Sequence, residues 1–197
     1  IGIDMGLSTF ATIAQGDDNH LQEIANPRFL KKSLQKLRSL SRKLSRKIYK
    51  SRNWFKAKYN LQVYQVRLKN CRKDFAHKHS TQLVKSHDIV GVESLSIQSL
   101  LQNSPSSLAR SIADASWRQF LNFLQYKLQH ASKFFAEASR WFASTKICSG
   151  CSRKKEMKLS DRTFRCECGN ELGRDINAAI NIKNIALEMY KAAGASV

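Results

Sequence analysis

The sequence predicts an α/β fold in which short strands alternate with long helices and a small metal-binding module lies near the end. Three observations support this prediction. Short apolar runs bounded by turn residues occur at 1–15, 21–25 and 88–93. Longer stretches between and after them place an apolar residue every three or four positions, which is the helical period. Four of the five cysteines fall within residues 148–168.

The first 25 residues predict an antiparallel meander. Ile1-Gly-Ile-Asp4 reads as one strand, Gly6 as a turn, and Phe10–Ala14 as the returning strand. A polar turn, residues 16–20, then leads to a third strand at Leu21–Ala25. Further along the chain, Asp88–Glu93 has the pattern of a buried strand that ends in a carboxylate, and Phe134–Phe142 is a further strand candidate.

The helices carry the remaining apolar pattern. Pro27 opens a helical hairpin over about 27–86, broken near residues 51–53. One apolar stripe contains Leu30, Leu34, Leu37, Leu44 and Ile48, and the other contains Leu61, Tyr64, Leu68, Cys71 and Phe75. The two stripes are expected to bury each other. We predict a loop at 94–107, one helix of about six turns at Leu108–Ala131, and a closing helix at Ile176–Ala193.

The net charge of +19 is concentrated in one segment. Residues 28–78 contain eighteen Lys and Arg and a single acid, Asp74, for a local net charge of +17. An ordinary solvated helix face mixes both signs, so a field of one sign indicates a polyanionic partner, with nucleic acid favoured over an anionic membrane surface. The candidate nucleic-acid-binding residues are Lys31, Lys32, Arg42, Lys43, Arg46 and Lys47, together with Arg174.

Other classes of protein are disfavoured. No run of 18 apolar residues predicts a membrane span, and residue 1 onward lacks the layout of a signal peptide. We therefore expect a cytoplasmic, nucleoid-associated protein of a bacterium or archaeon, with no membrane partner. The chain starts at Ile1, inside a strand-like run, which favours a piece of a longer protein. The sequence indicates no oligomeric state.

The cysteine spacing predicts a closed zinc site. Cys148-x2-Cys151 and Cys166-x-Cys168 are two close pairs separated by fourteen residues, as tetrahedral Zn²⁺ with four thiolates requires. Disulfides are the alternative, and a reducing cytosol disfavours them. The second pair is one residue shorter than the usual spacing, which predicts a strained turn and some loss of affinity. Cys71, on a helical apolar stripe, is expected to be a core residue.

Three carboxylates stand at the ends of predicted elements. Asp4 and Glu93 end strands, and Asp175 precedes the closing helix. Three acids that converge from separate elements can hold two divalent ions about 4 Å apart, and such a pair stabilises phosphodiester hydrolysis. Each acid also has an ordinary explanation, such as a strand-end turn, a buried ion pair or, for Asp175, the N-cap of a helix.

Four motifs in this order resemble the C-terminal half of the TnpB (OrfB) family, the accessory transposases of small bacterial insertion sequences and relatives of type V CRISPR nucleases. They are Ile1-Gly-Ile-Asp-Met-Gly-Leu-Ser-Thr-Phe-Ala, Val90-Gly-Val-Glu-Ser-Leu, Ser144-Thr-Lys-x-Cys-x2-Cys and Gly173-Arg-Asp-Ile-Asn-Ala-Ala-Ile-Asn-Ile. Asn26-Pro-Arg-Phe and Ser111-Ile-Ala-Asp-Ala-Ser-Trp117 also match. The similarity extends from residue 1 to about residue 185.

The resemblance implies an RNase H-like (RuvC) mixed sheet with an inserted basic helical hairpin and a small zinc ribbon. Asp4, Glu93 and Asp175 would be the catalytic triad that binds Mg²⁺, and the ribbon would hold a structural Zn²⁺. The family cuts target DNA with a guide RNA that supplies sequence recognition. The implied domains are a RuvC-like nuclease core at 1–143, a zinc ribbon at 144–172, and the RuvC C-terminal motif with the closing helix at 173–197.

The sequence departs from the family in three ways. The N-terminal half is absent, the Cys166–Cys168 pair is short, and Gly173 and Ser152 stand where the family usually has Asp and Gly. Three functions are therefore weighed. A metal-dependent DNA endonuclease domain is favoured by the intact acids, and a catalytically idle nucleic-acid-binding remnant by the missing half. A DDE-type strand-transfer transposase is disfavoured by a zinc ribbon placed before the last acid.

Overall fold

A five-stranded mixed sheet forms the centre of the protein. The computed structural model describes residues 1–158 and 160–194. The strands lie in the order β3-β2-β1-β4-β5. Their bounds are β1 Gly2–Met5, β2 Thr9–Gln15, β3 His20–Ala25, β4 Ile89–Glu93 and β5 Phe134–Ala138. The α/β class and the mixed sheet are therefore as the sequence predicts.

The strand register explains why the sheet is mixed. The strands β1, β2 and β3 form the predicted antiparallel meander. Instead of extending it, β4 lies parallel to β1 with Gly2 opposite Gly91, and β5 lies parallel to β4 with Glu93 opposite Ala138. Parallel neighbours need long connections. Here the hairpin links β3 to β4, and a group of helices links β4 to β5.

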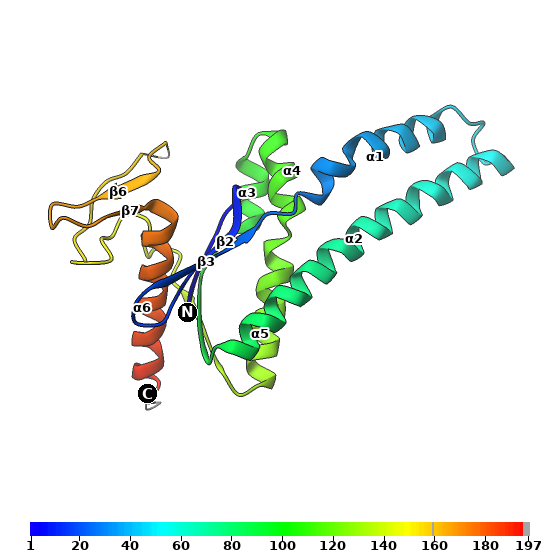
Figure 1. The fold of residues 1–197 in the computed structure, drawn as a ribbon. Helices are drawn as coiled ribbons and strands as arrows, with labels where there is room; N and C mark the ends of the chain where they lie inside the picture. The colour runs from blue at the N-terminus through cyan, green and yellow to red at the C-terminus, as the bar shows by residue number, and fades with distance from the viewer. Residues whose placement is uncertain (159, 195–197) are drawn as a thin grey trace.

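The sheet is covered by helices on both faces. On one face, Ile3, Val90 and Val92 pack into a core with Phe120 and Leu124 of α5 (Trp117–His130). The C-terminal end of α2 (Arg52–Ser86) adds to the same core. On the other face lies α6 (Arg174–Ala192), which crosses β1, β2, β4 and β5. Figure 1 shows α6 on the side of the sheet that faces away from the hairpin.

Two glycines let α6 lie directly on the sheet. Gly2 and Gly91 are partners in the register, and both face α6. A Cβ on Gly91 would lie 2.6 Å from the Ala186 Cβ, and one on Gly2 would overlap the backbone of Ala179 and Lys183. Because any side chain at these positions would push the helix away, the two glycines determine how deeply α6 sits.

The predicted hairpin is formed by α1 (Phe29–Ser45) and α2, which project from the sheet as a long arm (Figure 1). The Ser51 hydroxyl accepts a hydrogen bond from the Trp54 N–H and caps α2. Leu68, on the predicted stripe of α2, is buried. The expectation that the stripes bury each other is only partly met, because α1 has no fully buried residue and Ile48 is 82% exposed in the connecting turn.

Two predictions for the segment between β4 and β5 are wrong, one for a loop and one for a single long helix. Residues 94–107 were expected to form a loop, and yet α3 (Ile97–Asn103) forms there. The single helix expected at Leu108–Ala131 is instead two, α4 (Ser106–Ala115) and α5, because Ser116 adopts φ 54° and breaks the chain of hydrogen bonds. Its left-handed backbone changes the helix direction without interrupting the apolar pattern on either side.

One buried carboxylate joins the hairpin to this helical group. Asp114 of α4 accepts a 2.8 Å hydrogen bond from the Leu30 N–H at the start of α1. Its other oxygen lies 2.8 Å from the Arg72 guanidinium of α2. Asp114 is 9% exposed, so it satisfies an otherwise unpaired helix N-terminus and a cation in a partly dry site.

The small module near the end is a two-stranded ribbon of β6 (Thr163–Arg165) and β7 (Glu171–Gly173). It lies beside the N-terminal end of α6 in Figure 1. Residues 195–197, the end of the predicted third domain, lie outside the described residues. Over the ranges that the structure describes, every helix is too short or too polar to cross a bilayer.

Candidate functional site

Asp4 and Glu93 lie on neighbouring inner strands, at the carboxyl ends of β1 and β4. The parallel register places Ile3 opposite Val92, so the next residue of each strand is an acid. Side chains two positions apart in a strand point to the same face, and both acids therefore share the face of Gly2 and Gly91, which α6 covers. The carboxylates are thus held under the start of that helix.

Asp175 reaches the same place from α6. The helix begins at Arg174 with Gly173 as its N-cap, so Asp175 is in the first turn and the N-cap explanation for it is wrong. One turn further on, Ala179 lies against Gly2. The Arg174 Nε lies 3.3 Å from the Asp175 Oδ1, and the Asp175 side chain is 36% exposed. The structure therefore brings together all three predicted acids.

The proton affinities reflect this crowding. Burial, followed by the charges of Glu93 and Asp175, raises the pKa of Asp4 to about 8 against the weaker pull of Arg174. Burial also raises the pKa of Glu93 to about 7, although the Met5 N–H donates to this carboxylate and opposes the rise. Carboxylates that repel one another in a dry site are stabilised by a shared cation.

The four cysteines form a separate cluster in the ribbon. The Sγ atoms of Cys148 and Cys168 are 3.6 Å apart, as are those of Cys151 and Cys166, and all four lie within 4.8 Å of one another. Zn–S bonds of about 2.3 Å give a tetrahedral edge of about 3.8 Å, whereas a disulfide is about 2.05 Å long. The cluster can therefore hold a zinc ion. Among residues 1–158 and 160–194 it is also the one group of potential ligands gathered this tightly.

The short Cys166–Cys168 pair is accommodated by a glycine. Gly169 takes φ 89°, and its N–H donates to the Cys166 carbonyl. The strain appears instead after the first pair, where Ser152 takes φ 59°. A left-handed backbone is costly for a residue with a Cβ, which gives a physical reason for Gly at this position in the family.

The sulfur environment favours a thiolate at Cys148 and disfavours one at Cys151. Burial opposes ionisation of Cys148, and yet donors that include the Asn170 amide and the N–H groups of Gly150 and Cys151 lower its pKa to about 6. At Cys151 the Arg153 N–H lowers the pKa, but the neighbouring sulfurs outweigh it and raise the pKa to about 12. One thiolate thus forms readily and suppresses the others, unless a cation compensates the charge.

Sequence reasoning missed two asparagines that fasten the ribbon to α6. The Asn177 Oδ1 accepts from the Ser149 N–H at 3.0 Å, and its Nδ2 donates to the Ile147 carbonyl at 2.7 Å. The Asn181 Nδ2 donates to the carbonyls of Ser144 and Ile147, each at 2.7 Å. Both asparagines are buried. Two amides four residues apart in a run of alanines and isoleucines, Ile176–Ile182, were the available signal.

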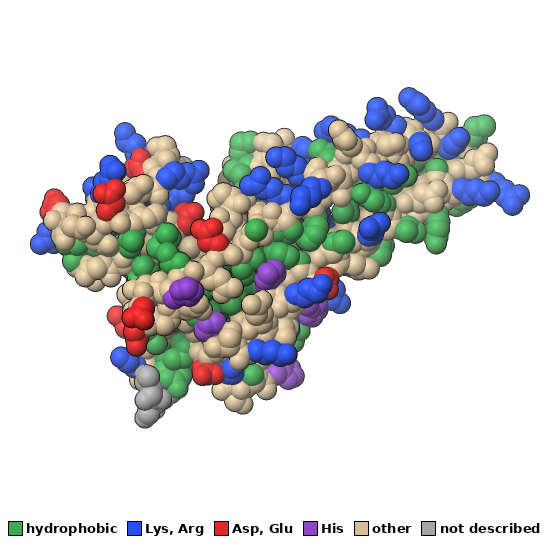
Figure 2. All heavy atoms as spheres, viewed as in Figure 1, with side chains coloured by type: hydrophobic (Ala, Val, Ile, Leu, Met, Phe, Trp, Pro, Cys, Tyr) green, Lys and Arg blue, Asp and Glu red, His purple; other side chains and the backbone are tan. Residues whose placement is uncertain are grey.

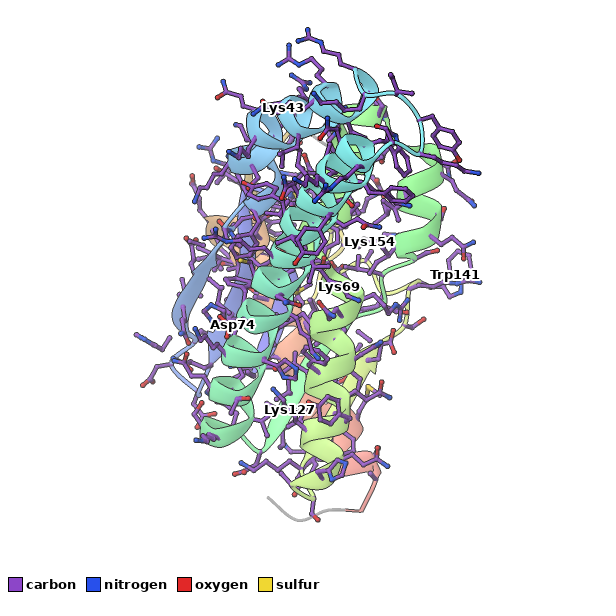
Figure 3. All side chains as sticks on the ribbon, turned by 90° about the vertical axis from the view of Figure 1, so that its right-hand side faces the viewer. Lys43, Lys69, Asp74, Lys127, Trp141 and Lys154 are labelled. Carbon is purple, nitrogen blue, oxygen red and sulfur yellow. The ribbon has the colours of Figure 1, made fainter. Side chains whose placement is uncertain are left out.

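The predicted nucleic-acid-binding residues divide into two places. Six lie exposed on or just after α1: Lys31, Lys32, Arg42, Lys43, Arg46 and Lys47. Figure 2 shows blue side chains along this arm, and Figure 3 shows Lys43 and Lys69 on it. Lys43 and Lys47 line a hollow of about 440 Å³ with Lys56 of α2. Arg174 is instead next to Asp175, so it belongs to the acidic site rather than to the hairpin.

Two family models cover most of the chain. Residues 1–104 match OrfB_IS605, described as "Probable transposase". The chain belongs to this family. Residues 117–182 match the TNB domain of Cas12f1-like proteins, which includes α5, β5 and the ribbon. The family resemblance found in the sequence is therefore confirmed.

Relatives from distant organisms agree with this assignment. The chain is 34% identical over 183 residues to a "Putative RNA-guided DNA endonuclease" of Streptomyces pristinaespiralis, covering 92% of this chain and 44% of the relative. It is 31% identical over 198 residues to "Putative RNA-guided DNA endonuclease InsQ" of Escherichia coli K12, covering 92% and 48%. For "TnpB-like protein L79" of Acanthamoeba polyphaga mimivirus the identity is 29%, covering 96% and 38%.

A solved structure shares the fold. The chain superposes on a protein in "Cryo-EM structure of the Cas12f1-sgRNA-target DNA complex" with a TM-score of 0.65 at 18% identity, covering 93% of this chain and 49% of that one. The chain therefore spans less than half the length of these relatives and of this neighbour.

Proposed function

We propose that this chain is the catalytic part of a Mg²⁺-dependent DNA endonuclease with an RNase H-like (RuvC) fold. The observation that carries the proposal is the meeting of Asp4, Glu93 and Asp175 at one end of the sheet, where burial, and then the charges of Glu93 and Asp175, raise the pKa of Asp4. These acids are 89 and 82 positions apart in sequence. Three unrelated structural acids would have no reason to meet in a buried place and repel one another.

The residues at the site fit magnesium. Mg²⁺ takes carboxylate oxygens together with water, and it binds through few protein ligands, so three acids at this end of the sheet are an appropriate set. When bound, a pair of such ions supplies an activated water and stabilises the charge on the attacking and leaving oxygens. Asp4 and Glu93 would hold the metal from the rigid strands, and Asp175 would complete the set from α6.

The protein groups around the acids have separate roles in this proposal. The Met5 N–H orients the Glu93 carboxylate, and Arg174 holds Asp175 and offers a positive charge to a phosphate nearby. Strand-end positions are suitable because the sheet fixes them to within a fraction of an ångström, which two-metal chemistry requires. The cysteine cluster would hold a structural Zn²⁺ with no open position for chemistry.

We further propose that the basic hairpin binds nucleic acid through phosphates and that recognition is guided by RNA. The hairpin segment carries +17 of the +19 net charge, and its predicted residues are exposed. Relatives are named RNA-guided DNA endonucleases, and the structural neighbour is part of a complex with guide RNA and target DNA. The predicted division into 1–143, 144–172 and 173–197 would then separate the core, the ribbon and the returning helix.

The competing function is a catalytically idle nucleic-acid-binding remnant, for which the basic hairpin alone would be sufficient. To separate the two, this chain is fused to the N-terminal half of a relative and given that relative's guide RNA. Mg²⁺-dependent cleavage of matched DNA is expected, and Asp4→Ala, Glu93→Ala and Asp175→Ala should each abolish cleavage while binding persists. The matched control is Asp88→Ala, an exposed acid at the opposite end of β4.

Each outcome separates the nuclease from the non-cutting alternative or tests one acid of the triad. Normal cleavage by the Asp175→Ala fusion would remove Asp175 from the triad. Binding without cleavage by the unmutated fusion would establish the remnant instead. Cleavage that continues in all three variants would contradict the catalytic assignment altogether.

A further inference from the structure

A tryptophan stands out into solvent immediately after β5. Trp141 is 81% exposed, although tryptophan is a residue that proteins bury on average. Its backbone is held in a turn, because the Trp141 N–H lies 3.3 Å from the Ser139 hydroxyl and the Phe142 N–H donates to the Ser139 carbonyl at 2.8 Å. Figure 3 shows Trp141 at the outer edge of the molecule. The ring is therefore presented on a fixed turn.

A cation accompanies the ring. The Arg140 guanidinium lies 4.9 Å from the centre of the Trp141 ring. A guanidinium on an indole face is attracted to the ring and remains able to donate to a phosphate. Trp141 and Arg140 together thus offer one flat apolar surface and one phosphate partner, which are the two groups that an unpaired nucleotide requires.

The turn lies at the same end of the sheet as the acids. In the register of β4 and β5, Glu93 is opposite Ala138, and the turn begins with the next residue. Three residues span at most about 11 Å, and neighbouring strands are about 5 Å apart. Trp141 therefore lies within about 16 Å of Glu93 through space, a distance that about five stacked nucleotides cover.

We propose that Trp141, with Arg140, is a stacking platform for an unpaired base of the DNA strand that enters the acidic site. This proposal rests on the proposed function, since it assigns to that site a single-stranded substrate. A paired base has both faces covered within the duplex, so the platform would hold a strand only after it has been unwound. Trp141 would be a positioning residue that sets which phosphate lies at the acids.

The test measures binding of the 197-residue chain to a short single-stranded DNA, to its abasic counterpart and to the matching duplex. No Mg²⁺ is added, and 0.3 M salt reduces the phosphate contribution of the hairpin. Stacking of one base predicts that Trp141→Ala binds the base-bearing strand about 5- to 150-fold more weakly and leaves abasic DNA unaffected. Trp141→Phe should recover most of the affinity. Leu21→Ala, which trims an exposed apolar residue on β3, is the matched control and should change nothing.

Fluorescence provides a second measurement. In a Trp54→Phe background the remaining tryptophans are Trp141 and Trp117, and Trp117 is 5% exposed. Quenching by single-stranded DNA therefore reports on Trp141. Equal affinity of Trp141→Ala for the base-bearing strand, an equal loss for abasic DNA, or absence of quenching would each overturn the platform. None of these readouts depends on cleavage, so a failure of the nuclease proposal would be seen separately.

Discussion

Replacing Asp4 by Asn should stabilise the metal-free protein, and more so as the pH rises. Asn has the shape of a protonated Asp and carries no charge. Burial and neighbouring acids raise the pKa of Asp4 from 3.8 to about 8. Because each tenfold change in proton affinity corresponds to about 1.4 kcal/mol, ionised Asp4 costs the folded state on the order of 6 kcal/mol.

The direction of the pH dependence follows from which state holds the proton. Below pH 3.8 the carboxyl is protonated in both states. Between pH 3.8 and about 8 the folded chain keeps a proton that the unfolded chain has released, so the free energy of unfolding falls as the pH rises. From pH 5 to pH 8 the wild type should therefore lose about 4 kcal/mol relative to Asp4→Asn.

Urea unfolding at pH 5 and pH 9, in buffer free of Mg²⁺ and of chelators, measures this difference. Asp18→Asn, at an exposed acid in the turn after β2, is the control and should follow the wild type. Added Mg²⁺ should stabilise the wild type more at pH 9 than at pH 5, because only ionised carboxylates bind it. Parallel stability curves for the wild type and Asp4→Asn between pH 5 and pH 9 would refute the argument.

Three further measurements address the other features. Purified wild-type protein should contain one zinc per chain by elemental analysis, and less than about a third of an equivalent would exclude the site. The substitution Cys148→Ser should lower both the zinc content and the melting temperature. Ser152→Gly should stabilise the zinc-loaded protein by about 1 kcal/mol in thermal unfolding, since it removes the left-handed strain, whereas an unchanged or lower stability would contradict that cause. Replacing Lys31, Lys32, Arg42 and Lys43 by Gln should reduce the log–log salt slope of duplex binding by up to about 3.6, and an unchanged slope would mean that other residues contact the phosphates.

The sequence predicted the parts of the fold that depend on local pattern. The meander, the strand at Asp88–Glu93 and the hairpin all have alternations or stripes that neighbouring residues determine. The break between α4 and α5 at Ser116 was not predicted, because the apolar period continues through it and only the φ value of one residue changes. The helix α3 was not predicted either, because the Ser-rich composition around it indicated a loop.

The residues proposed for the site came from the sequence, whereas the way in which the fold brings them together did not. Spacing identified the cysteines, and the family motifs identified the acids. The parallel pairing of β1 with β4 joins residues about ninety positions apart, and no local pattern encodes such a register. Likewise, Asn177 and Asn181 acquire their role only when α6 meets the ribbon, because their partners are backbone carbonyls and an N–H group that any sequence would offer.

The helix that sits on Gly2 and Gly91 is synthesised after all five strands of the central sheet, which matters during translation. Asp4 and Glu93 are synthesised before Asp175, and 82 residue positions separate Glu93 from Asp175. At about 5–20 residues per second, the ribosome needs roughly 4–16 s to make them. Until α6 emerges, one face of the sheet lacks its cover and the acidic site lacks its third carboxylate. Under the proposed nuclease function, a nascent chain would therefore be inactive until α6 has docked.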